Sequence, residues 1–169
     1  DGIRDDLVTG VQTCALPISS GLTYGFTHCT PVDAAYRELG IQEQRPGYTL
    51  AHMIDELAEL PLEFQPGTAW NYSVATDVLG YLVEVISGRP LPEYFSQQIF
   101  EPLGMADTGF EIAPDKTVRF ASCYERNLKK ELVLQDDGQA SVYQDRTFYS
   151  GGGGLISTIA DYYRFCEML

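Results

Sequence analysis

The stretch PLEFQPGTAWNYSVATDVLGYLVEVISGRPLPEYFSQQIFEPLGMADTGF, residues 61–110, decides the fold, because a polar turn here runs directly into an apolar helical pattern. Ser73 is a suitable N-cap for that helix, and Gly88 followed by Pro90 is a typical C-terminal stop signal. The apolar residues between these signals fall on one helical face, namely Ala75, Leu79, Leu82, Val83 and Ile86. The pattern predicts an amphipathic helix that packs against a core.

Three further helices are predicted by the same criteria. One follows Thr49, a suitable N-cap, and has its apolar face at Leu50, Met53, Ile54, Leu57 and Ala58. A second spans about Pro92 to Phe100 and is expected to stop at Pro102. The last starts at Ser157 or Thr158 and has one face formed by Tyr162, Phe165, Cys166 and Leu169.

Between the third and fourth predicted helices the pattern becomes short and rich in β-branched and aromatic residues. The segments VRFASCYE (118–125), ELVLQ (131–135) and ASVYQ (140–144) are typical of strands or extended loops, with a turn at Asp137–Gly138. Helices followed by extended segments and a further helix indicate a piece of an α+β protein.

The first 18 residues, DGIRDDLVTGVQTCALPI, differ in character from the rest of the chain. They have neither the apolar run of a secretory signal nor the Arg-rich, acid-poor composition of a transit peptide. Residues 8–18 can be back-translated into DNA that resembles a widely used short-read sequencing adapter, and residues 1–5 into DNA that resembles its other half. We therefore interpret residues 1–18 as a translated adapter, and residues 19–169 as an internal fragment of a longer protein.

Composition restricts the classes of function. The net charge of −13 argues against binding to nucleic acid or to an anionic membrane surface, and no apolar run is long enough to span a membrane. Outside the first 18 residues the cysteines are Cys29, Cys123 and Cys166, whose spacing suits neither a disulfide framework nor a zinc site. The sequence predicts no metal and no cofactor, and it leaves the compartment and the oligomeric state open.

Common enzyme signatures are absent, and the glycine-rich segment SGGGGLIST (150–158) has two interpretations. It could form an anion-binding nest before a helix, although it lacks the Lys-Ser/Thr pair of a phosphate loop. The simpler interpretation, favoured by composition, is that its glycines allow a close approach of two backbones. His28 and His52, the only histidines, are isolated and are interpreted as surface or packing residues.

Several spaced motifs together resemble one family. PGTAWNYS, LVEVISGRPL and IFEPLGMADTGF within residues 61–110, SGLTYGF at 20–26 and GGGGLISTIADYYRF at 151–165 are similar to the class C β-lactamase and D-Ala-D-Ala carboxypeptidase superfamily. The esterase branch, the family VIII carboxylesterases, is the most similar. The resemblance covers essentially all of residues 19–169. It implies part of a β-lactamase/transpeptidase-like α+β fold, with a helical subdomain and an incomplete antiparallel sheet region.

The resemblance implies a Ser-Lys-Tyr mechanism that passes through an acyl-enzyme. The tyrosine comes from a Tyr-x-Asn or Tyr-x-x triplet, which is Tyr72-Ser73-Val74 here, so Tyr72 is the predicted catalytic residue. Ser73, Val74 and Tyr24 are predicted to line the substrate pocket. A tyrosine has a reference pKa of about 10, so acting as a base near neutrality requires about 4 kcal/mol of stabilisation by cations and donors.

The chain departs from the family pattern in two ways. It contains no Ser-x-x-Lys, the motif that supplies the nucleophile and its lysine, and it lacks the later Lys-Thr-Gly-like triplet. We therefore expect this polypeptide itself to be inactive. The second departure is Val74, which stands where β-lactamases of this type have Asn. A valine cannot bond a substrate amide, which favours small ester substrates.

Three alternatives remain open. The parent protein could act as a β-lactamase or D-Ala-D-Ala carboxypeptidase, or it could be a non-catalytic binding module of the same fold. An intact Ser-x-x-Lys in the upstream sequence would favour an enzyme, and its absence would favour the module. An independent helical domain is the third alternative, but helix faces without their sheet would lack a packing partner.

Overall fold

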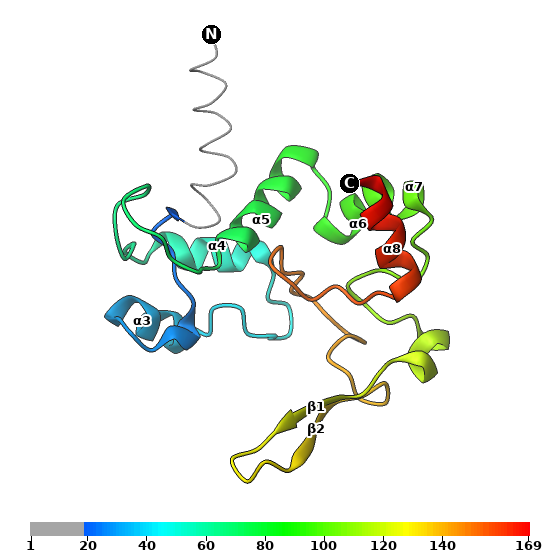
Figure 1. Cartoon of the computed structure of the whole chain (residues 1–169). Coiled ribbons are helices and arrows are strands. Elements are labelled where there is room, and N and C mark those ends of the chain that lie inside the picture. Colours follow the sequence, from blue (N-terminus) through cyan, green and yellow to red (C-terminus); the bar gives the residue numbers. More distant parts are fainter. Residues whose placement is uncertain (1–18) are drawn as a thin grey trace. The chain divides into compact units, whose positions relative to one another are not determined.

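A computed structural model describes residues 19–169, so the predicted adapter segment, residues 1–18, lies outside the described residues. Figure 1 shows the elements along the chain. The described residues divide into two compact units. Unit 1 comprises residues 19–94 and 147–153, and unit 2 comprises residues 95–146 and 154–169. No helix within residues 19–169 has both the length and the apolar character of a membrane-spanning helix.

Unit 1 is helical. The short 3-10 helix η2 (Gly25–Thr27) contacts α3 (Pro31–Leu39), and α4 (Leu50–Ala58) packs against α5 (Ala75–Ser87). Its buried apolar side chains come from all of these segments and from the connecting loops: Tyr24, Tyr36, Tyr48, Leu50, Met53, Leu57, Val74, Ala75, Leu91 and Phe148. The apolar face predicted for residues 50–58 thus contributes three residues to this core.

Side-chain caps define where two of these helices begin. Thr49 caps α4 as predicted, and the His52 side chain completes its capping box. The sequence analysis missed α3, although Thr30 and Asp33 form a capping box there and Gly40 ends the helix with a left-handed φ of 66°.

The ends of α5 partly match the prediction. Gly88 terminates the helix in the left-handed conformation, as expected. The predicted cap at Ser73 is wrong by one residue, because Val74 occupies the N-cap position. The Ser73 hydroxyl instead accepts a hydrogen bond from the N–H of Ala75 at 3.3 Å, so it still satisfies a donor at the start of the helix.

A close approach of two backbones joins residues 150–153, here called the glycine loop, to α5. A Cβ atom at Gly151 would collide with the carbonyl oxygen of Thr76 and lie 2.9 Å from the Cα of Gly80. A Cβ atom at Gly80 would lie equally close to the Cα of Gly151. The simpler interpretation of the glycine-rich segment is therefore confirmed at Gly151.

The segment predicted as one helix over residues 92–100 is longer and is built in three parts. α6 (Leu91–Phe95) leads into a π-helical turn, η3 (Ser96–Phe100), and then into α7 (Glu101–Leu103). The expected stop at Pro102 is wrong. A proline is accepted in the first turn of a helix, where its missing N–H has no partner to lose, and the helix ends instead at Gly104.

Unit 2 also contains a β-hairpin. Strands β1 (Cys123–Arg126) and β2 (Leu132–Asp136) pair antiparallel, with Tyr124 opposite Leu134. The third predicted extended segment, residues 140–144, forms no strand. The hydroxyl of Ser141 donates to Asp136 at 2.9 Å and accepts from the N–H of Tyr143, which folds this segment into a turn.

Helix α8 (Ile159–Met168) begins at Thr158, one of the two predicted caps, whose hydroxyl accepts from the N–H of Asp161. Its predicted apolar face is only partly covered in the described residues, because Tyr162 and Leu169 are exposed. The 3-10 helix η4 (Pro114–Arg119) precedes the hairpin. The buried apolar residues of unit 2 are Phe100, Met105, Phe110 and Ile112.

Replacing Gly151 with Ala tests the backbone contact. The added methyl group would overlap the backbone of α5, so we expect Gly151→Ala to lower the free energy of unfolding by about 1–3 kcal/mol. Gly153→Ala is the matched control, because a Cβ atom there meets nothing within 4 Å. Urea unfolding of the full-length protein measures both. Equal midpoints for the two variants would contradict the contact.

Asp33 predicts an acid dependence of stability. Burial alone would raise the pKa of its carboxyl group, but hydrogen bonds from Thr27, from the N–H groups of Cys29 and Thr30 and from Arg37 hold that pKa well below its usual range. A lowered carboxyl pKa stabilises the fold above the unfolded-state pKa of about 3.9, and this contribution disappears as the pH falls through the folded-state pKa.

We therefore expect Asp33→Asn to lower the unfolding midpoint at neutral pH and to reduce its further loss below about pH 4. The exposed Asp55→Asn on α4 controls for the change of charge. Urea midpoints at pH 7 and near pH 3 measure both effects. An Asp33→Asn variant with the same acid dependence as the wild type would contradict the assignment.

Candidate functional site

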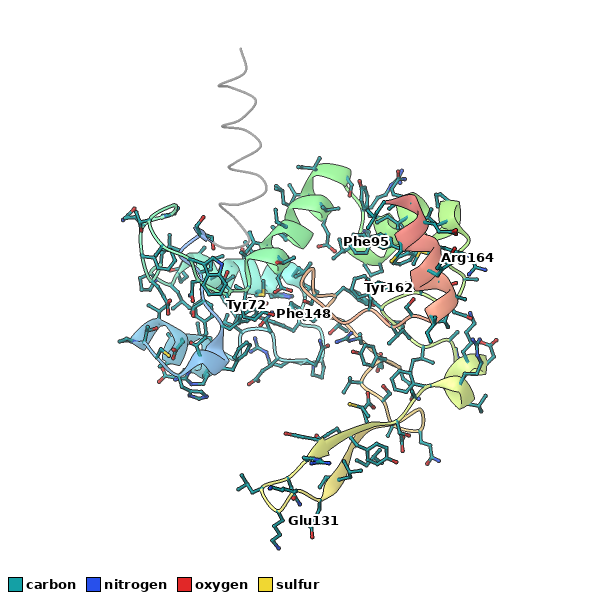
Figure 2. All side chains as sticks on the ribbon, viewed as in Figure 1. Tyr72, Phe95, Glu131, Phe148, Tyr162 and Arg164 are labelled. Carbon is teal, nitrogen blue, oxygen red and sulfur yellow. The ribbon has the colours of Figure 1, made fainter. Side chains whose placement is uncertain are left out.

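The turn at residues 65–74, here called the Tyr72 turn, is fixed to the segment SGLTYGF by backbone and side-chain hydrogen bonds. The N–H of Val74 donates to the carbonyl of Thr23 at 3.2 Å. The amide of Asn71 donates to the carbonyl of Leu22 at 2.9 Å and to the carboxylate of Glu63 at 2.8 Å. Tyr72 lies between these two attachments, so its backbone has little freedom to move (Figure 2).

The three residues of the predicted triplet have different environments. The side chain of Tyr72 is 60% exposed, whereas Ser73 and Val74 are 2% and 0% exposed. Ser73 holds the start of α5, and Val74 lies in the core of unit 1. Only the tyrosine is therefore free to meet a ligand, and the predicted pocket roles of Ser73 and Val74 remain predictions.

Tyr72 belongs to a group of aromatic rings. Its ring lies 4.7 Å from that of Tyr24, tilted by 52°, and Phe26 stacks on the other side of Tyr24 at 4.8 Å. Phe26 is exposed like Tyr72, and Trp70 in the same turn is 68% exposed. The structure thus brings together two predicted site residues, Tyr24 and Tyr72, beside exposed aromatic surface.

Asp77 in the first turn of α5 lies behind these rings and is fully buried. Its carboxylate accepts hydrogen bonds from the Ser150 hydroxyl, from the N–H of Gly152 at 3.3 Å and from the amide of Gln42 at 2.6 Å. Burial raises the pKa of Asp77, and these donors oppose the effect. The N–H of Gly152, considered above as part of an anion nest, therefore binds a carboxylate of the protein itself.

The hydroxyl of Tyr24 joins this network to Tyr72. It is hydrogen-bonded both to Tyr72 and to Gln42. Burial raises the pKa of Tyr24 to about 12, and the nearby charge of Asp77 adds to the effect. Tyr24 is therefore protonated over the physiological range and can act as a hydrogen-bond donor.

Sequence reasoning missed Gln42, Asp77 and Ser150. Gln42 is 35 residues and Ser150 is 73 residues away from Asp77 along the chain, so no local pattern connects them. One signal was available, namely an acidic residue among the apolar positions at the start of a helix that was predicted to be buried. A charge in such a place requires hydrogen-bond partners.

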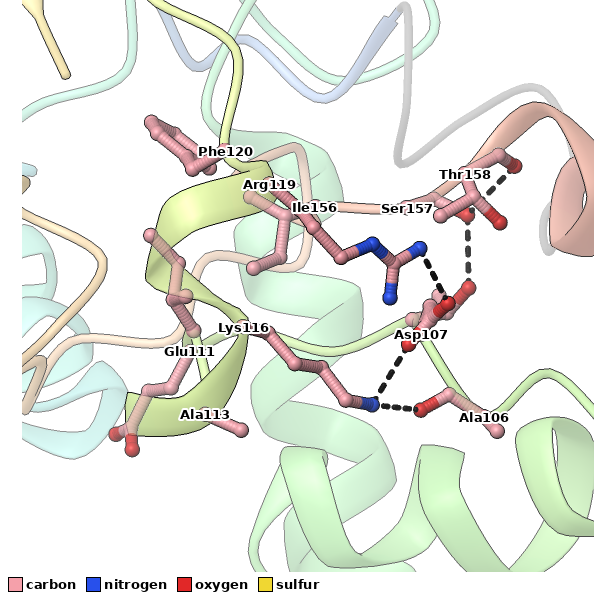
Figure 3. Close-up of a pocket in the computed structure, with 12 residues that line it drawn as sticks. Ala106, Asp107, Glu111, Ala113, Lys116, Arg119, Phe120, Ile156, Ser157 and Thr158 are labelled. Carbon is pink, nitrogen blue, oxygen red and sulfur yellow. Dashed lines mark hydrogen bonds and ion pairs between the residues drawn. The ribbon is translucent and has the colours of Figure 1, made fainter. Parts of the chain in front are cut away.

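Unit 2 has a cavity of its own, of about 170 Å³, between the segment 106–120 and the start of α8. Lys116 and Arg119 extend from η4 into it and both form ion pairs with Asp107, at 2.7 Å and 2.9 Å (Figure 3). The Arg119 guanidinium, then Lys116, lower the pKa of Asp107 to about 2. These charges neutralise one another within the protein, which assigns them a structural role.

Comparisons with known proteins place the chain among enzymes. The family model described as Beta-lactamase matches residues 16–169. Protein Rv1367c of Mycobacterium tuberculosis is 40% identical over 151 residues, which cover 89% of this chain and 36% of that protein. Esterase EstB of Burkholderia gladioli is 30% identical over 168 residues, which cover 89% of this chain and 42% of the esterase. The chain thus spans about two fifths of the length of these relatives.

A solved structure agrees with these matches. EstCE1, described as a hydrolase with promiscuous acyltransferase activity, superposes with a TM-score of 0.73 at 27% identity. The match covers 91% of this chain and 44% of EstCE1.

Proposed function

Because this chain belongs to the Beta-lactamase family, whose members include esterases, we propose that its parent protein is a serine hydrolase that cleaves small carboxylic esters through an acyl-enzyme. Tyr72 is the proposed general base. The observation that supports this role best is the contrast within the triplet, where Tyr72 is exposed and both residues after it are buried. A catalytic side chain must reach its substrate, and only Tyr72 can do so from this turn.

The proposed reaction uses a serine and a lysine that the printed sequence does not contain. The serine oxygen attacks the ester carbonyl carbon while its proton passes to Tyr72, which acts together with the lysine. The tetrahedral intermediate expels the alcohol, which takes up that proton. Water then attacks the acyl-enzyme with Tyr72 again as base, releasing the carboxylic acid and regenerating the serine.

Val74 supports esters over amides as substrates. Its side chain has no hydrogen-bonding group and is buried in unit 1, so it offers nothing to the amide of a β-lactam or a peptide. The resemblance of EstB and EstCE1 points in the same direction, since their names describe an esterase and a hydrolase. β-Lactamase or D-Ala-D-Ala carboxypeptidase activity, and a non-catalytic module, are the alternatives.

Substitution of Tyr72 tests the role of the base. In the full-length protein, we expect Tyr72→Phe to lower kcat/KM for a short-chain nitrophenyl ester by about 100-fold or more, the typical contribution of a general base. Tyr124→Phe, which removes the hydroxyl of another exposed tyrosine in the hairpin, is the matched control and should leave the rate unchanged. If Tyr72→Phe hydrolysed the ester as fast as the wild type, Tyr72 would not be the base.

The absence of a Ser-x-x-Lys gives a second expected outcome. A polypeptide of residues 19–169 should release no burst of nitrophenol from such an ester, because it has no serine beside a lysine to acylate. Stopped-flow absorbance measures the burst, with the full-length protein as the positive control. A burst stoichiometric with the short polypeptide would show that another nucleophile is present.

A further inference from the structure

Asp77 is placed to control the direction of the hydrogen bonds that reach Tyr72. Its carboxylate is fully buried, and its partners are the Ser150 hydroxyl, the N–H of Gly152 and the amide of Gln42. A backbone N–H can only donate, and Ser150 already accepts from the N–H of Gly152 at 3.1 Å. The surroundings of Asp77 therefore suit an ionised carboxylate that accepts every bond.

An ionised carboxylate fixes the orientation of the Gln42 amide. A carboxylate only accepts, so the NH₂ group of Gln42 must face Asp77, at 2.6 Å. Gln42 has a φ of 70°, in the left-handed region that a residue with a side chain seldom adopts. Such a conformation costs free energy and persists where the surrounding structure requires it. Here it brings the amide to Asp77 and to Tyr24.

The hydroxyl of Tyr24 passes the orientation on to Tyr72. Its bond with Gln42 lowers the Tyr24 pKa, as expected where the Tyr24 oxygen accepts, whereas its bond with Tyr72 raises that pKa, as expected where Tyr24 donates. The two rings lie 4.7 Å apart, close enough for this contact. The chain of bonds thus runs from the Gln42 N–H to the Tyr24 oxygen, and from the Tyr24 O–H to the Tyr72 oxygen.

We propose that Asp77 is a positioning residue for Tyr72: its carboxylate turns the NH₂ group of Gln42 toward Tyr24, which leaves the Tyr24 O–H to donate to the Tyr72 oxygen. This inference rests on the proposed role of Tyr72 as the base. Negative charge develops on the Tyr72 oxygen when that oxygen is deprotonated, and a fixed donor stabilises this charge most strongly in the transition state. The same carboxylate binds the glycine loop, so one group sets the position of both segments.

An uncharged amide at position 77 would reverse the chain. Asn in place of Asp77 would present its own NH₂ group, and the Gln42 amide would turn its oxygen toward it or lose the bond. Once the Gln42 amide is no longer held, the Tyr24 hydroxyl is free to rotate away from Tyr72. Asp77→Asn should therefore affect the chemical step more than the binding of the ester.

The test is a double-mutant cycle in the full-length protein with a short-chain nitrophenyl ester. We expect Asp77→Asn to lower kcat about tenfold or more, as for loss of one charge-assisted hydrogen bond, and to change KM less than about twofold. In a Tyr24→Phe background the same change should lower kcat less than about twofold further, because the connection is already broken. Asp55→Asn is the charge control and should leave kcat unchanged.

Equal losses of kcat in both backgrounds would overturn the proposal, because Asp77 would then act without Tyr24. If Asp77→Asn does not fold, Gln42→Met decides instead, since it cuts the chain of bonds and leaves the contacts of Asp77 with the glycine loop in place. Gln42→Met must then show the same loss of kcat and the same dependence on Tyr24. Failure of this cycle while Tyr72→Phe is inactive rejects only the inference. A fully active Tyr72→Phe rejects the proposed function as well.

Discussion

The buried carboxylate of Asp77 is the interaction on which the rest of unit 1 depends. It accepts hydrogen bonds from Gln42 and from Ser150, which lie 35 and 73 residues away along the chain, so it connects three segments at one point. A buried charge is tolerated only when donors surround it. The left-handed φ of Gln42 and the close approach of Gly151 to Gly80 are both consistent with this requirement. Helix α5 therefore serves as the frame for the other two segments.

The sequence predicted the helices well where their signals are local. The α+β class and the β-lactamase-like fold are confirmed by the family match and by the likeness to EstCE1. The caps of α4 and α8 were predicted from single threonines. α3 was missed because its short apolar pattern concealed the capping box that begins at Thr30. The segment 140–144 looked extended, but the hydrogen bonds of Ser141 make it a turn.

The site was predictable only in part. The choice of Tyr72 came from resemblance, since nothing in the spacing separates it from the other tyrosines of the chain. Its position beside Tyr24 depends on the attachment of Asn71 and Val74 to the segment SGLTYGF, about 50 residues earlier in the chain. Such long-range hydrogen bonds leave no periodic trace in a sequence. For the same reason the network behind Tyr72 became visible only in three dimensions.

Trp70 gives this arrangement an optical consequence. It is the only tryptophan of the chain, it is largely exposed, and it stands two residues before Tyr72 in the same turn. The intrinsic indole emission of this polypeptide therefore originates at a single point beside the proposed base. A change in polarity there, as when an apolar acyl group displaces water, would alter the emission spectrum without any attached dye.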